Sequence, residues 1–167
     1  NYFLGGRGKH FRGSASRIEK LLEDADRQNP DHVLCTGDVT QMSFDREFEI
    51  CAGLFGPRLN HSERYTVLPG NHDRYTTKAD AERRFEKWFG SLCAEGKYPF
   101  VKPLGERITL VGLDPCRSTS LVDSSGLIGV EQLSALQAVL SRLKEESQFV
   151  IVALHYGIFR KHGNPDK

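Results

Sequence analysis

"LPGNHDRY", residues 68–75, sets three polar side chains directly after an apolar run. Asn71, His72 and Asp73 are adjacent, so they cannot all face a hydrophobic core. Gly70, just before them, permits a tight turn. The stretch therefore indicates a short buried strand that ends in a turn, with side chains able to bind a metal or a substrate just beyond it.

Apolar runs of this kind alternate with helical patterns over the first 100 residues. Ser16 and Glu19 have the spacing of a capping box at the start of one helix. Ser43 can cap a second helix, and residues 79–90 predict a third, more charged one. Strands are expected at 32–38 and 65–71. Strands that alternate with helices favour an α/β fold with parallel strands.

The pattern changes after residue 97. Residues 98–105 and 107–115 predict an antiparallel hairpin, and 130–143 predict a strongly amphipathic helix. Residues 148–157 form a continuous apolar run, which is typical of a strand covered on both faces. No linker or low-complexity segment interrupts the chain, so we expect one domain over residues 1–167.

The composition is that of a soluble globular protein. The chain has 167 residues, of which 38% are hydrophobic and 27% charged, and its formal net charge of +1 gives no strong nucleic-acid signal. No apolar run is long enough to span a membrane. The cysteines are scattered and lack the spacing of a zinc knuckle or a disulfide scaffold, so buried thiols and a cytoplasmic location are expected.

Polar residues fall at the ends of three predicted strands. Asp38 follows "HVLCTG", Asn71 and His72 follow "YTVLPG", and His155 follows "FVIVAL". Ligand sites in open α/β sheets form at the carboxyl ends of strands. Each residue alone has an ordinary alternative, since Asp38 suits a turn and His155 could be a hydrogen-bonded core histidine. Together, carboxylate, amide and imidazole groups favour a metal site with oxygen and nitrogen ligands.

These motifs resemble the calcineurin-like metallophosphoesterase superfamily, in particular its bacterial small-molecule phosphodiesterases and pyrophosphatases. The family pattern is DxH, GD, GNH[D/E], a strand-borne His and GHxH. Gly37-Asp38, the Gly70–Asp73 stretch and His155 match the middle three motifs, whereas DxH and GHxH are missing. The resemblance implies a four-layer α/β/β/α sandwich with mixed sheets, incomplete at both termini, so we expect an internal segment of a longer protein.

The resemblance also implies a mechanism. Two divalent ions (Mn, Fe or Zn) would activate a hydroxide that attacks phosphorus, with Asp38, Asn71 and His155 as metal ligands. His72 would stay off the metals and give a proton to the leaving oxygen. Asp73 would either orient neighbouring groups or cap the following helix, and Arg74 would either contact a substrate phosphate or remain solvated.

Several alternatives stay open. The chain could be a catalytically inactive scaffold of the same family, or an unrelated nucleotide-binding α/β protein, although it has no GxGxxG or GxxxxGK[ST] motif. Expected substrates are a cyclic nucleotide, another phosphodiester or monoester, or a nucleotide-linked lipid. Residues 2–12 mix aromatic and basic side chains and could touch a membrane surface or form a plain surface loop. Without DxH and GHxH, the segment alone is expected to bind metal weakly and hydrolyse little.

Overall fold

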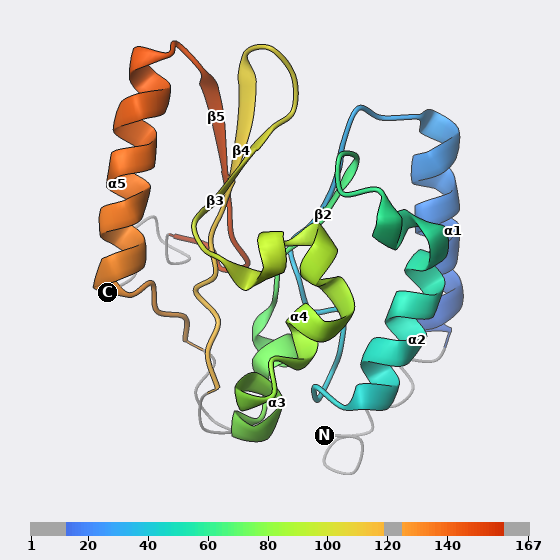
Figure 1. Cartoon of the computed structure of the whole chain (residues 1–167). Helices are drawn as coiled ribbons and strands as arrows, with labels where there is room; N and C mark the ends of the chain where they lie inside the picture. The colour runs from blue at the N-terminus through green and yellow to red at the C-terminus, as the bar shows by residue number, and fades with distance from the viewer. Residues whose placement is uncertain (1–12, 119–124, 159–167) are drawn as a thin grey trace.

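A computed structural model describes residues 13–118 and 125–158 of the chain. Two small sheets stand side by side at the centre, and helices cover their outer sides (Figure 1). The expected contact of residues 2–12 with a membrane lies outside the described residues. Within the described ranges, no helix has both the length and the apolar character needed to cross a membrane.

The two sheets differ in their strand directions. One contains two parallel strands, and the other has the order β3-β4-β5, with β4 antiparallel to β3 and parallel to β5. This arrangement confirms the parallel pairing expected in the first half and the hairpin expected in the second. The strands are β1 (Val33–Cys35), β2 (Tyr65–Val67), β3 (Phe100–Pro103), β4 (Ile108–Gly112) and β5 (Phe149–Ala153).

The helices complete a layered arrangement. Helices α1 and α2 lie outside the β1–β2 sheet, and α5 lies outside the three-stranded sheet on the opposite side (Figure 1). The order across the molecule is therefore α/β/β/α, as expected. In the described part of the chain the three-stranded sheet is mixed, whereas the two-stranded sheet is parallel. The helices are α1 (Ser14–Gln28), α2 (Asp45–Phe55), α3 (Thr77–Ala81), α4 (Arg84–Phe89) and α5 (Val130–Glu145); short 3₁₀ turns are η2 (Gly56–Asn60), η3 (Asn71–Arg74), η4 (Gly90–Leu92) and η5 (Ala94–Gly96).

A continuous core joins the α1–α2 layer to both sheets. Phe48 of α2, Val67 of β2, Phe89 of α4 and Leu110 of β4 belong to one cluster of buried side chains. The ring of Phe89 also meets the ring of Phe55 edge-on, with 5.4 Å between their centroids. Because β2 is buried along its whole length, the turn that follows it starts from a fixed position.

Helix starts differ from the sequence expectation in three places. Helix α1 begins at Ser14 behind Gly13, so the capping box predicted at Ser16 is wrong. Helix α2 is capped by Phe44, whose N–H donates to the Glu47 carboxylate at 3.0 Å, and Ser43 has another role. The single helix expected over 79–90 is split into α3 and α4 at Arg83, which adopts a left-handed conformation.

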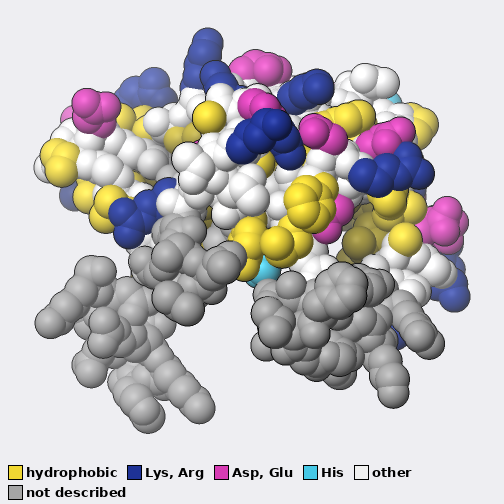
Figure 2. All heavy atoms as spheres, turned by 90° about the horizontal axis from the view of Figure 1, so that it is seen from below, with side chains coloured by type: hydrophobic (Ala, Val, Ile, Leu, Met, Phe, Trp, Pro, Cys, Tyr) yellow, Lys and Arg dark blue, Asp and Glu magenta, His cyan; other side chains and the backbone are white. Residues whose placement is uncertain are grey.

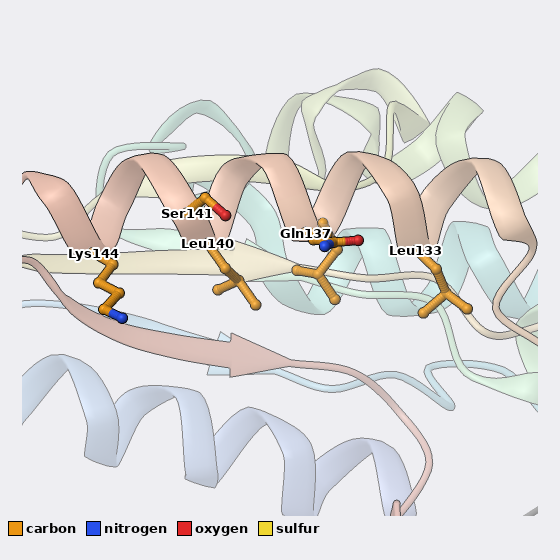
Figure 3. A pocket seen from close by; sticks show the side chains of 6 residues that line it. Leu133, Gln137, Leu140, Ser141 and Lys144 are labelled. Atoms are coloured by element: carbon orange, nitrogen blue, oxygen red, sulfur yellow. The ribbon is translucent and has the colours of Figure 1, made fainter.

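Helix α5 and strand β5 form as expected but are less covered than their patterns indicate. Leu143 is the buried leucine of α5, whereas Leu133 is 48% exposed and lines a groove along the helix with Leu140 (Figure 3). In β5 the side chains of Phe149 and Ile151 are 66% and 38% exposed. The expectation that this strand is covered on both faces is therefore wrong for the described part of the chain, in which β5 forms the edge of its sheet.

Candidate metal centre

The ends of β1, β2 and β5 converge on one point. His155 Nε2, two residues beyond β5, lies 3.1 Å from Asn71 Oδ1 and 3.5 Å from Asp38 Oδ1. The three predicted metal ligands therefore lie together, although they are separated by up to 117 positions in the chain (155 minus 38).

The tautomer of His155 determines what this cluster can bind. Its Nδ1–H donates to the carbonyl oxygen of Thr36 at 2.7 Å, so the Nε2 of the neutral ring carries a lone pair. That lone pair faces the Asn71 amide oxygen and a carboxylate oxygen of Asp38. Three electron-pair donors that face one another repel unless a proton or a metal ion lies among them.

The spacing of these atoms fits a metal ion. With ligand distances of roughly 2.0–2.2 Å, donors around one tetrahedral or octahedral ion lie roughly 2.9–3.6 Å apart. The two separations from His155 Nε2 fall in that range. In the described parts of the chain, no three His, Cys, Asp or Glu side chains are placed to hold a metal. The set found here instead uses the Asn71 amide as its third donor.

Glycines allow the backbone that follows β1 to contact the backbone that follows β2. A Cβ atom on Gly70 would lie 2.2 Å from Asp38 Oδ1, and one on Gly37 would lie 2.3 Å from the Gly70 nitrogen. Gly37 (φ 105°) and Asp38 (φ 60°) both adopt left-handed conformations, which Gly and Asp tolerate better than most residues. The GD and GN pairs are therefore explained by close backbone approach.

Asp73 clamps these two exits together. Its carboxylate accepts hydrogen bonds from the N–H groups of Asp38 (2.9 Å), Val39 (3.3 Å), Thr40 (2.8 Å) and Gly70 (2.8 Å). Burial raises the pKa of Asp73, and the backbone hydrogen bonds act in the opposite direction. Of its two predicted roles, Asp73 orients the neighbouring backbone.

The other predicted role of Asp73 belongs to a different residue. Thr76 caps the following helix, α3, because its side chain accepts from the Ala79 N–H at 3.1 Å.

His72 lies beside the three donors with its ring fixed in place. Its Nδ1–H donates to the Gln41 carbonyl at 2.6 Å, and its ring stacks on Tyr75 with 5.3 Å between centroids. Its carbonyl accepts from the Ser43 hydroxyl at 2.7 Å, the role that Ser43 has in place of a helix cap. Nε2 is therefore the ring nitrogen that can exchange a proton with a substrate.

Arg74 contradicts both predictions made for it. It is buried, and its guanidinium contacts the carboxylates of Asp80, Glu86 and Asp114, so it is neither solvated nor available to a phosphate. Asp114 lies 40 positions along the chain from Arg74. Sequence spacing gives no signal for such a contact.

Two core thiols and the described surface give no support to other functions. Burial raises the pKa of Cys51 to about 12 and that of Cys93 to about 11, so both thiols are protonated and poor nucleophiles at neutral pH. On the described part of the face seen in Figure 2, Lys and Arg side chains are interspersed with Asp and Glu. Such a surface gives no support to nucleic-acid binding.

Comparison with known proteins gives a family match and a similar fold. The sequence model of the calcineurin-like phosphoesterase family matches residues 10–166. The fold is similar to a dimetal phosphatase from Danio rerio, with a TM-score of 0.66 and 17% sequence identity over 89% of this chain. The match covers 62% of that phosphatase, so the chain spans less than two thirds of its length. No curated protein sequence matches the chain significantly.

Proposed function

The chain belongs to the calcineurin-like phosphoesterase family, and we propose that it hydrolyses a phosphate ester with the help of divalent metal ions held at Asp38, Asn71 and His155. The observation that carries this proposal is the convergence of three electron-pair donors from three strand ends. The Asn71 and Asp38 oxygens lie 3.1 and 3.5 Å from His155 Nε2, which its Nδ1 hydrogen bond leaves unprotonated in the neutral ring.

The proposed ligands suit Mn, Fe or Zn ions, and two ions would be bound in the working enzyme. A divalent ion at this point supplies Lewis acidity toward a phosphoryl oxygen and an activated water. Asp38 contributes negative charge, while the neutral Asn71 amide and His155 imidazole orient the ion without offsetting its charge further. The Thr36 carbonyl holds the Nδ1 proton of His155, so that Nε2 would be free to bind an ion, a common role for the partner of a ligating histidine.

His72 is the proposed proton donor to the leaving oxygen. The Gln41 carbonyl holds the proton on Nδ1, so a second proton on Nε2 can be passed to substrate. Stacking on Tyr75 prevents the ring from turning away. The proposed substrate is a small phosphorylated molecule, such as a cyclic nucleotide, another phosphodiester or a nucleotide-linked lipid.

Metal titration of the 167-residue chain tests the proposal. We expect Mn²⁺ to raise the melting temperature of metal-free protein, EDTA to reverse the rise, and Asn71→Ala or His155→Ala to abolish it. His61→Ala is the control, because the His61 side chain is exposed and bonds only to Glu63 among the side-chain contacts described for it. Hydrolysis of bis(p-nitrophenyl) phosphate, expected to be slow, should depend on the same metal and on His72. Absence of metal binding, or binding that survives both ligand substitutions, would contradict the proposal.

A further inference from the structure

Arg74 is buried next to the proposed metal centre and bonds to three carboxylates. Its Nε and Nη2 both donate to Asp114 Oδ2, at 3.0 and 2.7 Å, and its Nη1 donates to Asp80 Oδ1 at 3.0 Å. Nη2 also donates to Glu86. The Arg74 side chain is only 9% exposed, and those of Asp114 and Glu86 are 10% and 7% exposed. All three nitrogens of the planar guanidinium therefore donate to a carboxylate.

The contact between Arg74 and Asp114 joins segments that follow strands of different sheets. Arg74 ends the η3 turn after β2, three positions after Asn71. Asp114 follows β4, whose parallel neighbour β5 leads into His155. The Arg74–Asp114 contact thus connects the segment that carries Asn71 to the sheet that carries His155.

Asp114 is itself held firmly, so it can act as an anchor. Its Oδ1 accepts from the Cys116 N–H at 2.8 Å. Its backbone N–H and carbonyl bond to the two ends of the Gln132 amide on α5, at 2.9 and 3.0 Å. The Cys116 thiol also donates to the Pro69 carbonyl at 3.3 Å, a second link between the same two segments.

The charges make Arg74 difficult to replace. Burial lowers the pKa of Arg74, but Asp114, Glu86 and Asp80 raise it more, so the guanidinium stays charged. Without it, the buried carboxylates of Asp114 and Glu86 would be left near each other with no cation between them, which is unfavourable. A lysine keeps the charge but cannot reach three carboxylates with a planar fork.

We propose that Arg74 is a positioning residue that holds Asn71 and His155 at metal-binding distance by tying the β2 exit to Asp114. The inference rests on the proposed metal centre. It assigns Arg74 no contact with metal or substrate. Its effect is transmitted through the relative placement of the two sheets.

Metal affinity of Arg74→Lys in the full 167-residue chain tests this inference. Calorimetric titration with Mn²⁺, well below the melting temperature, should give an affinity about tenfold weaker than wild type, as for other residues that support metal ligands indirectly. Arg58→Lys is the matched control, since Arg58 is also a largely buried arginine that pairs with an aspartate, Asp26. It should lower stability without changing metal affinity.

A metal-free measurement separates the inference from the proposed function. The ¹⁵N resonances of the His155 ring should shift in Arg74→Lys and stay unchanged in Arg58→Lys. Wild-type protein that binds no Mn²⁺ would contradict the proposed function, and the resonances would still test the positioning role. Wild-type affinity together with unchanged His155 resonances in Arg74→Lys would overturn the inference.

A second pair of variants applies if Arg74→Lys does not fold. Asp114→Asn weakens the contact between the sheets, whereas Asp80→Asn removes the more exposed carboxylate and leaves that contact intact. We expect weaker Mn²⁺ binding in Asp114→Asn and unchanged binding in Asp80→Asn. Equal affinities in the two variants would also overturn the inference.

Discussion

Two aspartates at the candidate site have opposite surroundings and therefore different roles. Asp73 is 1% exposed, and both of its carboxylate oxygens accept hydrogen bonds from backbone N–H groups. These bonds leave few lone pairs for a metal. Asp38 is exposed, and one of its oxygens faces His155. Asp73 therefore holds the loops in place, whereas Asp38 has an oxygen available to bind a cation.

Removing the charge of Asp73 should loosen the fold. Asp73→Asn replaces one acceptor oxygen with an NH₂ group that faces backbone donors. We expect a loss of about 2–3 kcal/mol in the free energy of unfolding, measured by urea denaturation, because hydrogen bonds to a charged group are strong. Asp31→Asn, on an exposed residue, should stay within about 0.5 kcal/mol of wild type. Similar losses of stability in both variants would contradict the role of the Asp73 carboxylate in holding the two loops together.

The close approach at Gly70 predicts a sharp contrast between two glycines. In Gly70→Ala the new methyl group must displace the Asp38 carboxylate, and we expect a loss of about 1–3 kcal/mol in stability together with weaker Mn²⁺ binding. Gly53, inside α2, has open space around it, so Gly53→Ala should gain about 0.5–1 kcal/mol from helix propensity. Thermal unfolding and calorimetric titration of both variants check the contrast.

Asp38, Asn71 and His155 could be predicted from the sequence to follow strands, because a buried strand is visible locally as a short run of apolar residues. Parallel pairing of β1 and β2 brings Asp38 and Asn71 to one edge of their sheet. His155 follows a strand of the other sheet and reaches the same point through the packing of the two sheets. The surroundings of Arg74 could not be predicted in the same way. Its partner Asp114 lies in a segment whose position depends on the packing of two sheets, and no local pattern encodes that packing.

At the scale of elements, the presence of each helix and strand was easier to predict than the residues at which it begins and ends. The break between α3 and α4 places the Arg83 guanidinium against the Glu95 carbonyl at 2.6 Å and the Arg84 guanidinium against the Ser43 carbonyl at 3.0 Å. These distant contacts outweigh the local helical preference of residues 79–90. Similarly, α1 starts before its predicted cap, and no side-chain bond closes that end.

Helix α5 has an uneven apolar stripe, which gives a prediction for its two ends. Leu143→Ala should lower the free energy of unfolding by about 2–4 kcal/mol, because this side chain is buried and would leave a cavity. Leu133→Ala should cost less than about 1 kcal/mol, since half of that side chain already contacts solvent. Urea denaturation of both variants measures the difference. Equal losses would mean that the groove along α5 is covered in solution.

For the whole molecule, the order of elements predicted the α/β class, and the family resemblance implied the layered α/β/β/α architecture. The contacts that join the two sheets could not be predicted from either. Lys102 of β3 donates to the Tyr65 carbonyl at 3.0 Å and to the Thr66 hydroxyl at 2.6 Å, along β2. Arg74 connects the sheets beyond the carboxyl end of the same strand. A buried or half-buried cation thus bridges the two sheets at each end of β2.

The buried thiols should make the fold sensitive to alkali. Burial raises the pKa of Cys51 from 9.0 to about 12 and that of Cys93 to about 11. Their contribution to stability is therefore fully present below pH 9 and is lost as the pH rises toward the folded-state pKa, because the unfolded chain releases these protons first. Each thiol gives a slope of up to about 1.4 kcal/mol per pH unit in that window.

Replacing these two thiols should flatten the alkaline limb of the stability curve. Cys51→Ala/Cys93→Ala will start from a lower free energy of unfolding at pH 8, since both side chains fill the core. Between pH 9 and pH 10.5 it should lose about 3 kcal/mol less than wild type, because each thiol of the unfolded chain is half titrated at pH 9 and approaches the full slope only above that pH. Cys35, Cys116 and Tyr98 retain raised pKa values and keep part of the slope in both proteins. Urea denaturation across this range measures both curves, and parallel curves would show that the two thiols do not titrate differently on folding.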